Sequence, residues 1–166
     1  MSTPIPTLSE LPLRKAMEER DLVAATNAFA ADAVFNSPFT DKLVFRGREQ
    51  IAALTRIVLE DFDDFRYTAE VRTEKTAFLV ARAKVDGQEI EIVDHLRLNR
   101  DGQVEEMTVF FRPLPAAATA LRVLGAGLGR RRSATRGAIV SALARPLGLM
   151  TRLGDGLGVR LVRPPH

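Results

Sequence analysis

The sequence predicts an α+β domain in which helices near the N-terminal end pack on one side of an antiparallel sheet. Apolar residues recur at helical spacing through the first sixty residues, and from residue 65 onward they alternate with polar residues. Two Asp-Gly pairs, Asp86-Gly87 and Asp101-Gly102, separate the alternating segments, as expected for hairpin turns. Helices followed by such a meander are typical of the α+β class.

Three helices are expected before the long strands. A capping box at residues 7–10 precedes the first, and Asp21 is a favourable N-cap for the second. Gly47 marks the start of the third. Apolar residues repeat along one face of each helix: Leu13, Ala16 and Met17 in the first, Leu22, Ala25 and Phe29 in the second, and Ile51, Leu54 and Val58 in the third.

Short strands are expected at 34–35 and 43–45, between the second and third helices. Four longer strands follow, and the alternation bounds them at 65–73, 77–85, 89–98 and 103–112. The four form a continuous meander, since each connection is only a few residues long.

One face of the strand at 89–98 combines aliphatic residues with a single acid. Strand parity directs Asp94 to the same side as Ile92 and Leu96, and directs His95 to the opposite side. Burying a lone carboxyl costs a few kcal/mol. Asp94 is therefore a candidate polar anchor for a ligand, and the alternative is an acid paired with an interior Arg or with backbone. No second polar group facing Asp94 is evident.

The net charge of +3 conceals two regions of different composition. Up to Pro113 the chain carries 15 basic and 20 acidic residues, and from Leu114 to His166 it carries nine Arg, no Lys and one acid, Asp155. All nine Phe and the one Tyr precede residue 114. We therefore divide the chain into a domain at 8–113 and a basic, Ala/Leu/Gly/Arg-rich helical extension at 114–166.

Three interpretations of the extension compete. Ile139, Leu143, Leu147 and Met150 form a stripe at about helical spacing, which favours packing on the domain. The cluster of Arg130–Arg132 would also suit an anionic membrane surface, with peripheral contact only, since no stretch of about 18 uncharged apolar residues occurs. Nucleic acid is the least favoured partner, because no aromatic residue accompanies the arginines.

Composition excludes several kinds of chemistry. The chain has no Cys, so disulfides, thiolate catalysis and Cys-rich zinc sites are excluded. With His95 and His166 as the two histidines, no metal cluster is evident, and we expect neither a metal nor a cofactor. Residues 1–13 lack a charged segment followed by an apolar one, so no secretory signal is expected and a cytoplasmic location is favoured.

Two segments resemble a known family. The segment VFRGREQI (Val44–Ile51) and the strand pair Val93–Met107, in this order of elements, are similar to the SnoaL-like group of the nuclear-transport-factor-two-like superfamily, and the strand pair resembles that of ketosteroid isomerases. The resemblance implies a cone-shaped curved sheet around a pocket for a small apolar ligand. Asp94 matches the acid that donates a hydrogen bond in the isomerase. The residues expected to line the pocket are Phe35, Phe39, Leu54, Ile92, Leu96, Met107, Val109 and Phe111.

Two isomerase positions carry other residues here. The Asp-Pro that supplies the general base in the isomerase corresponds to Ser37-Pro38, and the helix tyrosine corresponds to Leu13. A serine hydroxyl does not remove a proton from carbon unaided, and leucine donates nothing. The resemblance therefore implies the pocket and not the reaction. Ser37, with Asn36 and Asp41, is better explained by turn chemistry before Pro38.

Two functions follow from these observations. The first is a small-molecule-binding protein for a steroid, terpenoid or polyketide type of compound, with enzymatic activity left open. The second is a non-catalytic interaction domain whose basic extension packs on the domain or binds an anionic membrane. In either case we expect a homodimer that pairs through the outer sheet face, where Glu89, Glu91, His95 and Arg97 lie.

Overall fold

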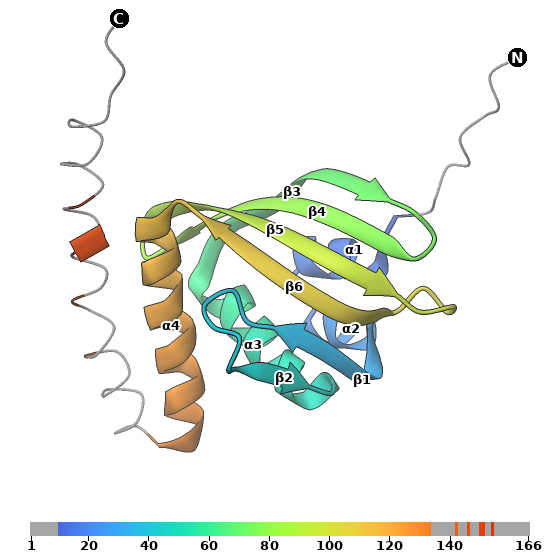
Figure 1. Ribbon diagram of the computed structural model, residues 1–166, viewed down its shortest axis with the longest axis horizontal. Coiled ribbons are helices and arrows are strands. Elements are labelled where there is room, and N and C mark those ends of the chain that lie inside the picture. The colour runs from blue at the N-terminus through green and yellow to red at the C-terminus, as the bar shows by residue number, and fades with distance from the viewer. Residues whose placement is uncertain (1–9, 134–141, 143–145, 147–149, 152–153, 155–166) are drawn as a thin grey trace, which may run out of the picture.

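The computed structural model describes residues 10–133 together with residues 142, 146, 150, 151 and 154. Three helices lie on one side of the sheet: α1 (Pro12–Glu18), α2 (Leu22–Asn27) and α3 (Arg48–Asp61) (Figure 1). The N-cap prediction for α2 is confirmed, since the Asp21 carboxylate accepts the backbone N–H of Ala24 at 2.9 Å. Leu11 occupies the N-cap of α1, and most of the predicted capping box lies outside the described residues.

Six strands form one curved sheet in the order β2-β1-β6-β5-β4-β3. The predicted four-stranded meander is confirmed, because the last four strands pair antiparallel with one another in chain order. The strands are β1 (Phe29–Asn36), β2 (Val44–Arg46), β3 (Phe62–Arg72), β4 (Thr76–Val85), β5 (Gln88–Leu98) and β6 (Val104–Arg112).

The sheet as a whole is mixed, because one pairing outside the predicted antiparallel meander is parallel. Strand β1 pairs parallel with β6, with Phe35 opposite Met107. The second helix is also shorter than predicted, because α2 ends at Asn27 and Phe29 begins β1. Phe29 is buried in either arrangement, so its apolar character does not distinguish a helix face from a strand.

The turn between β4 and β5 has the conformation that its sequence predicts. Asp86 and Gly87 both have positive φ, 49° and 74°. Two such residues define a type I′ turn, whose twist matches that of the flanking strands. This tight turn fixes the register of β4 on β5, which pairs Leu79 with Asp94.

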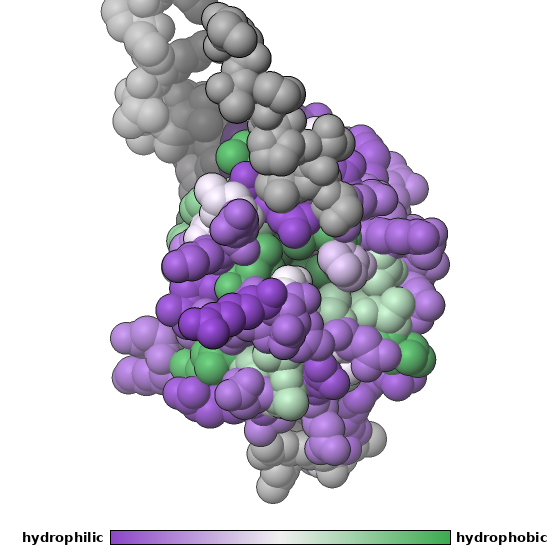
Figure 2. Space-filling view, turned by 90° about the vertical axis from the view of Figure 1, so that its right-hand side faces the viewer, coloured by the Kyte–Doolittle hydropathy of each residue, from purple (hydrophilic) through white to green (hydrophobic). Residues whose placement is uncertain are grey.

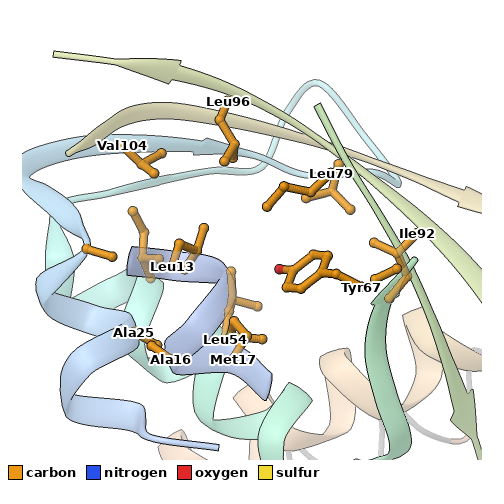
Figure 3. Packing of buried hydrophobic residues seen from close by; sticks show 14 of the residues in the cluster. Leu13, Ala16, Met17, Ala25, Leu54, Tyr67, Leu79, Ile92, Leu96 and Val104 are labelled. Atoms are coloured by element: carbon orange, nitrogen blue, oxygen red, sulfur yellow. The ribbon is translucent and has the colours of Figure 1, made fainter. Parts of the chain in front are cut away.

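The core fills the space between the concave face of the sheet and the helices. Figure 3 shows the side chains of Leu79, Ile92 and Leu96 from the sheet above those of Leu13 and Leu54 from the helices. Seen from the right-hand side of Figure 1, the surface is mostly hydrophilic, with hydrophobic residues in small separate areas (Figure 2).

The first part of the basic extension is a helix that packs on the domain. Helix α4 (Leu114–Arg132) lies against α3 and the β4–β5 end of the sheet (Figure 1). Gln88 Nε2 donates to Thr119 Oγ1 at 2.6 Å, and Arg122 forms an ion pair with Asp86. The backbone of Gly127 comes so close to Ile57 that an added Cβ would lie 2.7 Å from Ile57 Cδ1. Small residues on α4 therefore permit close contact with α3.

The apolar stripe predicted for the extension lies mostly outside the described residues, which do not include Ile139, Leu143 and Leu147. Within the described part of the chain, no helix has the length and apolar character needed to cross a membrane.

Candidate ligand-binding site

A cavity of about 70 Å³ lies inside the cone, between the concave face of the sheet and the helices α1 and α3. Ten of the residues around it are apolar, and the three with polar side-chain atoms are Thr55, Tyr67 and Asp94. The Thr55 hydroxyl donates to the backbone oxygen of Ile51, at 3.0 Å, within its own helix. The apolar lining consists of Leu13, Met17, Phe29, Phe35, Ile51, Leu54, Val58, Phe65, Ile92 and Met107.

Asp94 lies on the inner face of β5, between Leu79 of β4 and Val109 of β6. Its side chain is buried, with 2% of the residue exposed. Burial in this apolar environment raises the pKa of Asp94 from 3.8 to about 7, and the hydrogen bond from Tyr67 acts in the opposite direction. A large share of the Asp94 carboxyls is therefore protonated at neutral pH.

Tyr67 reaches Asp94 from β3, which is separated from β5 by β4. Its hydroxyl donates to Oδ2 of Asp94 at 3.2 Å, and its ring lies edge-on to Phe65. Figure 3 shows the phenol between the sheet residues Leu79 and Ile92 and the helix residues below. Burial, followed by the nearby Asp94 carboxylate, raises the pKa of Tyr67 well above its ordinary value of 10. The phenol therefore keeps its proton and remains a hydrogen-bond donor.

The expectation that no second polar group faces Asp94 is wrong, and Tyr67 is the residue that the sequence analysis missed. A usable signal was present, because Tyr67 is the one Tyr of the chain and lies in a predicted strand. Strand parity did not reveal its direction, because β3 changes register between Asp63 and Arg66 and again between Tyr67 and Ala69. Each bulge reverses the side to which the following residues point.

The other predicted site residues divide into three groups. Phe35, Leu54, Ile92 and Met107 line the cavity with Asp94. Leu96 and Val109 lie on the same concave face and are buried in the core without bordering the cavity. Phe39 and Phe111 contact each other, with ring centroids 5.5 Å apart, and pack against the core from the side.

Ser37 forms a turn, as its preferred interpretation predicted. Its Oγ accepts the backbone N–H of Phe39 at 3.2 Å, and it does not line the cavity. Asn36 donates to Glu106 and Thr108 of β6. His95 stacks on Phe78 with ring centroids 4.5 Å apart, on the outer face of the sheet. In the part of the chain that the structure describes, no group of three or more His, Cys, Asp or Glu residues is arranged to hold a metal ion.

Chemically, the cavity offers a hydrogen-bond donor in an apolar environment. Tyr67 donates its one O–H to Asp94, and a protonated Asp94 keeps its own O–H for a ligand. That donor suits a ligand oxygen that accepts hydrogen bonds, such as a carbonyl. Among the lining residues there is no second carboxylate or histidine that would serve as a general base.

The comparisons with known proteins identify the family and the fold. The family model of the SnoaL-like domain matches residues 13–107. A steroid delta-isomerase from Pseudomonas aeruginosa is 26% identical, with a TM-score of 0.63, and the match covers 81% of this chain and 98% of that one. An uncharacterized protein with a cystatin-like fold from Silicibacter pomeroyi is 22% identical, with a TM-score of 0.66 and coverages of 75% and 86%.

A third structure is the epoxide hydrolase/cyclase-like enzyme SalBIII of pyran ring formation in polyether salinomycin. It is 17% identical, with a TM-score of 0.51, and the match covers 60% of this chain and 84% of that one. No curated protein matches the sequence significantly. The fold is that of the cone-shaped, nuclear-transport-factor-two-like proteins. The chain belongs to the SnoaL-like domain family.

Proposed function

We propose that the protein binds a small, largely apolar molecule inside the cone, where Tyr67 orients Asp94 and the protonated Asp94 donates a hydrogen bond to an acceptor oxygen of that molecule. The supporting observation is the Asp94–Tyr67 hydrogen bond of 3.2 Å in a lining that is otherwise almost wholly apolar. Binding sites of this type combine apolar walls with a few convergent polar groups. A ketone of the steroid, terpenoid or polyketide class matches both features.

The size of the cavity limits how such a ligand enters. A volume of about 70 Å³ is below the roughly 300–1,000 Å³ of sites that enclose drug-sized ligands. Met17 and Met107 border the cavity, and unbranched thioether side chains repack at low cost. We propose that movement of these side chains enlarges the site when a ligand binds.

The relatives suggest two reaction classes, isomerisation and cyclisation. In ketosteroid isomerase, a carboxylic acid held neutral by an apolar site donates a hydrogen bond to the developing oxyanion, and we propose the same polarising role for Asp94. Isomerisation also needs a base, and the lining offers none. We therefore propose ligand binding and carbonyl polarisation, without steroid isomerisation.

Thermal unfolding with a ligand panel tests the proposal. Saturating ketones at about 100 times the dissociation constant should add about 2.7 kcal/mol to the free energy of unfolding. Matched hydrocarbons without the oxygen should bind about tenfold more weakly, because the buried O–H of protonated Asp94 stays unpaired. Tyr67→Phe should reduce this preference, whereas Glu19→Gln, at the exposed C-cap of α1, should leave it unchanged. A flat response across a broad apolar panel would count against a ligand site.

A second candidate function, self-association, rests on the outer face of the sheet. We define the outer patch as Val71, Phe78 and Phe110, which are 69%, 44% and 56% exposed. Val71 pairs with Phe78 of β4, and Phe110 of β6 pairs with Val93 of β5. Val93 in turn pairs with Val80, two residues after Phe78 on β4, so the patch is continuous. Charged pairs such as Arg82–Glu91 and Arg97–Glu106 surround it. We propose a homodimer that pairs through this face. His95 lies on the same face and stacks on Phe78 of its own chain.

Light scattering checks the homodimer. We expect a dimer mass at tens of micromolar and a monomer mass for Phe110→Glu, because a carboxylate at the centre of an apolar interface has no partner. Val23→Glu is the matched control, since Val23 is 70% exposed on α2, away from the patch. A monomer mass for the unmodified chain, or a dimer that survives Phe110→Glu, would contradict the proposal.

A further inference from the structure

Strand β3 is the last strand of the sheet, and helix α1 covers its free edge. The backbone N–H of Tyr67 donates to Oε1 of Glu18 at 2.9 Å. The side chain of Arg14, one helical turn earlier, donates to Oε2 of Glu70 at 3.2 Å. Helix α1 is thus fastened to β3 at two points that lie on either side of the second bulge, and it also contributes Leu13 and Met17 to the cavity.

The carboxylate of Glu18 is held in a defined orientation. Its Oε2 lies 3.8 Å from Nε of Arg14, which leaves Oε1 for the N–H of Tyr67. Glu70, on the other side of the same guanidinium, is the largest cause of the raised pKa of Arg14. Arg14 therefore lies between Glu18 of the helix and Glu70 of the strand and interacts with both.

The bulges of β3 make this fastening important for the direction of Tyr67. Phe62 pairs with Val85, Tyr67 with Ala81 and Glu70 with Leu79, and all three strand partners are buried. The inward-facing positions of β3 therefore change from even to odd numbers and back to even within nine residues. Between two bulges, the regular ladder constrains the backbone less than in a continuous strand, and bulges commonly redirect a side chain next to a functional site. A bond to the N–H of Tyr67 fixes the peptide from which the phenol projects.

We infer that Glu18 is the positioning residue of the Asp94–Tyr67 pair: by accepting the N–H of Tyr67 at the bulged edge of β3, it sets the phenol within hydrogen-bond reach of Asp94. The inference rests on the proposed function only in treating the pair as the binding site. No part of it follows from the isomerase resemblance, where the matching tyrosine position is Leu13.

The protonation of Asp94 in the ligand-free protein provides the test. The phenol donates to the Asp94 carboxylate and lowers its pKa, so loss of this hydrogen bond raises the pKa. Around Asp94, Tyr67 is the one titratable residue in the cavity lining; the lining residues of α1, α3, β1 and β6 carry no ionisable side chain. Carbon-13 NMR of the Asp94 carboxyl therefore reports the contact directly.

We expect Glu18→Ala to raise the pKa of Asp94 by about one pH unit, and we expect Tyr67→Phe to raise it by the same amount. Removal of the Glu18 charge by itself acts in the opposite direction, because a nearby negative charge raises the pKa of a carboxyl. Glu18→Gln keeps an acceptor oxygen without the charge and should not raise the Asp94 pKa. Glu18→Asp keeps the charge but shortens the side chain, and it should raise the pKa. In a Tyr67→Phe background, Glu18→Ala should add no further increase.

The control is Glu19→Ala, which removes an exposed acid from the same helix end. The inference is overturned if Glu18→Ala and Glu18→Asp fold and leave the pKa of Asp94 unchanged or lower, or if their effects add to that of Tyr67→Phe. Ligand is absent from the measurement. A protein that binds no ligand would overturn the proposed function and leave this inference standing. An unchanged Asp94 pKa in the Glu18 variants would overturn this inference and leave the proposed function standing.

Discussion

Deletion of residues 114–166 is expected to lower the thermal midpoint by roughly 10 °C or more, or to cause aggregation. Helix α4 contributes Ala116, Ala120 and Leu124 to the same buried cluster as the cone. Its removal also exposes Ile57 of α3, which lies against Gly127 and is 2% exposed in the intact chain. Burying a single Leu contributes about 1.5–3 kcal/mol, so losing a whole helix face is a large effect.

The same deletion distinguishes packing from membrane binding. If the extension were an independent membrane module, the truncated domain would keep its midpoint and lose binding to anionic vesicles, and binding of the full chain would weaken as salt rises. We expect a lowered midpoint. An unchanged midpoint with an unchanged oligomeric mass would contradict the packing interpretation.

A point substitution tests the same contact if the truncated chain cannot be purified. Gly127→Ala inserts a methyl group 2.7 Å from Ile57 Cδ1, and overpacking of this kind costs about 1–3 kcal/mol. In an Ile57→Ala background the space is open, so Gly127→Ala should instead stabilise by up to about 1 kcal/mol through helix propensity. Equal effects in both backgrounds would show that α4 does not pack on Ile57.

The second large effect concerns pH. The Asp94 carboxyl ionises near pH 3.8 in an unfolded chain and near 7 in the folded protein. Between these values the folded state binds more protons, so the free energy of unfolding falls as pH rises through this window and levels off above it. At about 1.36 kcal/mol per pH unit, the total loss is roughly 4 kcal/mol. Below pH 3.8 the carboxyl is protonated in both states, so the stability is fully present there and the loss has not begun.

Asp94→Asn should remove this dependence while preserving the shape of the side chain. Urea unfolding at several pH values between 4 and 8 should therefore show the variant gaining stability relative to the unmodified protein as pH rises. Asp32→Asn, at an exposed position on β1, serves as the control and should leave the pH profile of Asp94 intact. Parallel profiles for the Asp94 variant and the unmodified protein would contradict a buried carboxyl that titrates near neutrality.

Much of the fold could be predicted from local patterns. The Asp21 N-cap and the turn at Asp86-Gly87 depend on residues close together in the sequence, and both have the expected conformation. The alternation of β5 was sufficient to direct Asp94 inward and His95 outward, because that strand pairs without a bulge along its length with β4. The sequence therefore placed Asp94 on the face of β5 that borders the cavity.

The tertiary structure alone decided the rest, because long-range pairing determines it. The sequence does not state that β1 lies parallel to β6, nor where a bulge interrupts β3, since both depend on which strands meet. Tyr67 faces Asp94 from a strand that two bulges interrupt, on either side of Tyr67. Whether an apolar residue lines the cavity, as Ile92 does, or fills the core, as Leu96 does, depends on the helices packed opposite it. Local periodicity assigns a residue to a face, and only the packing of distant elements leaves part of that face unfilled.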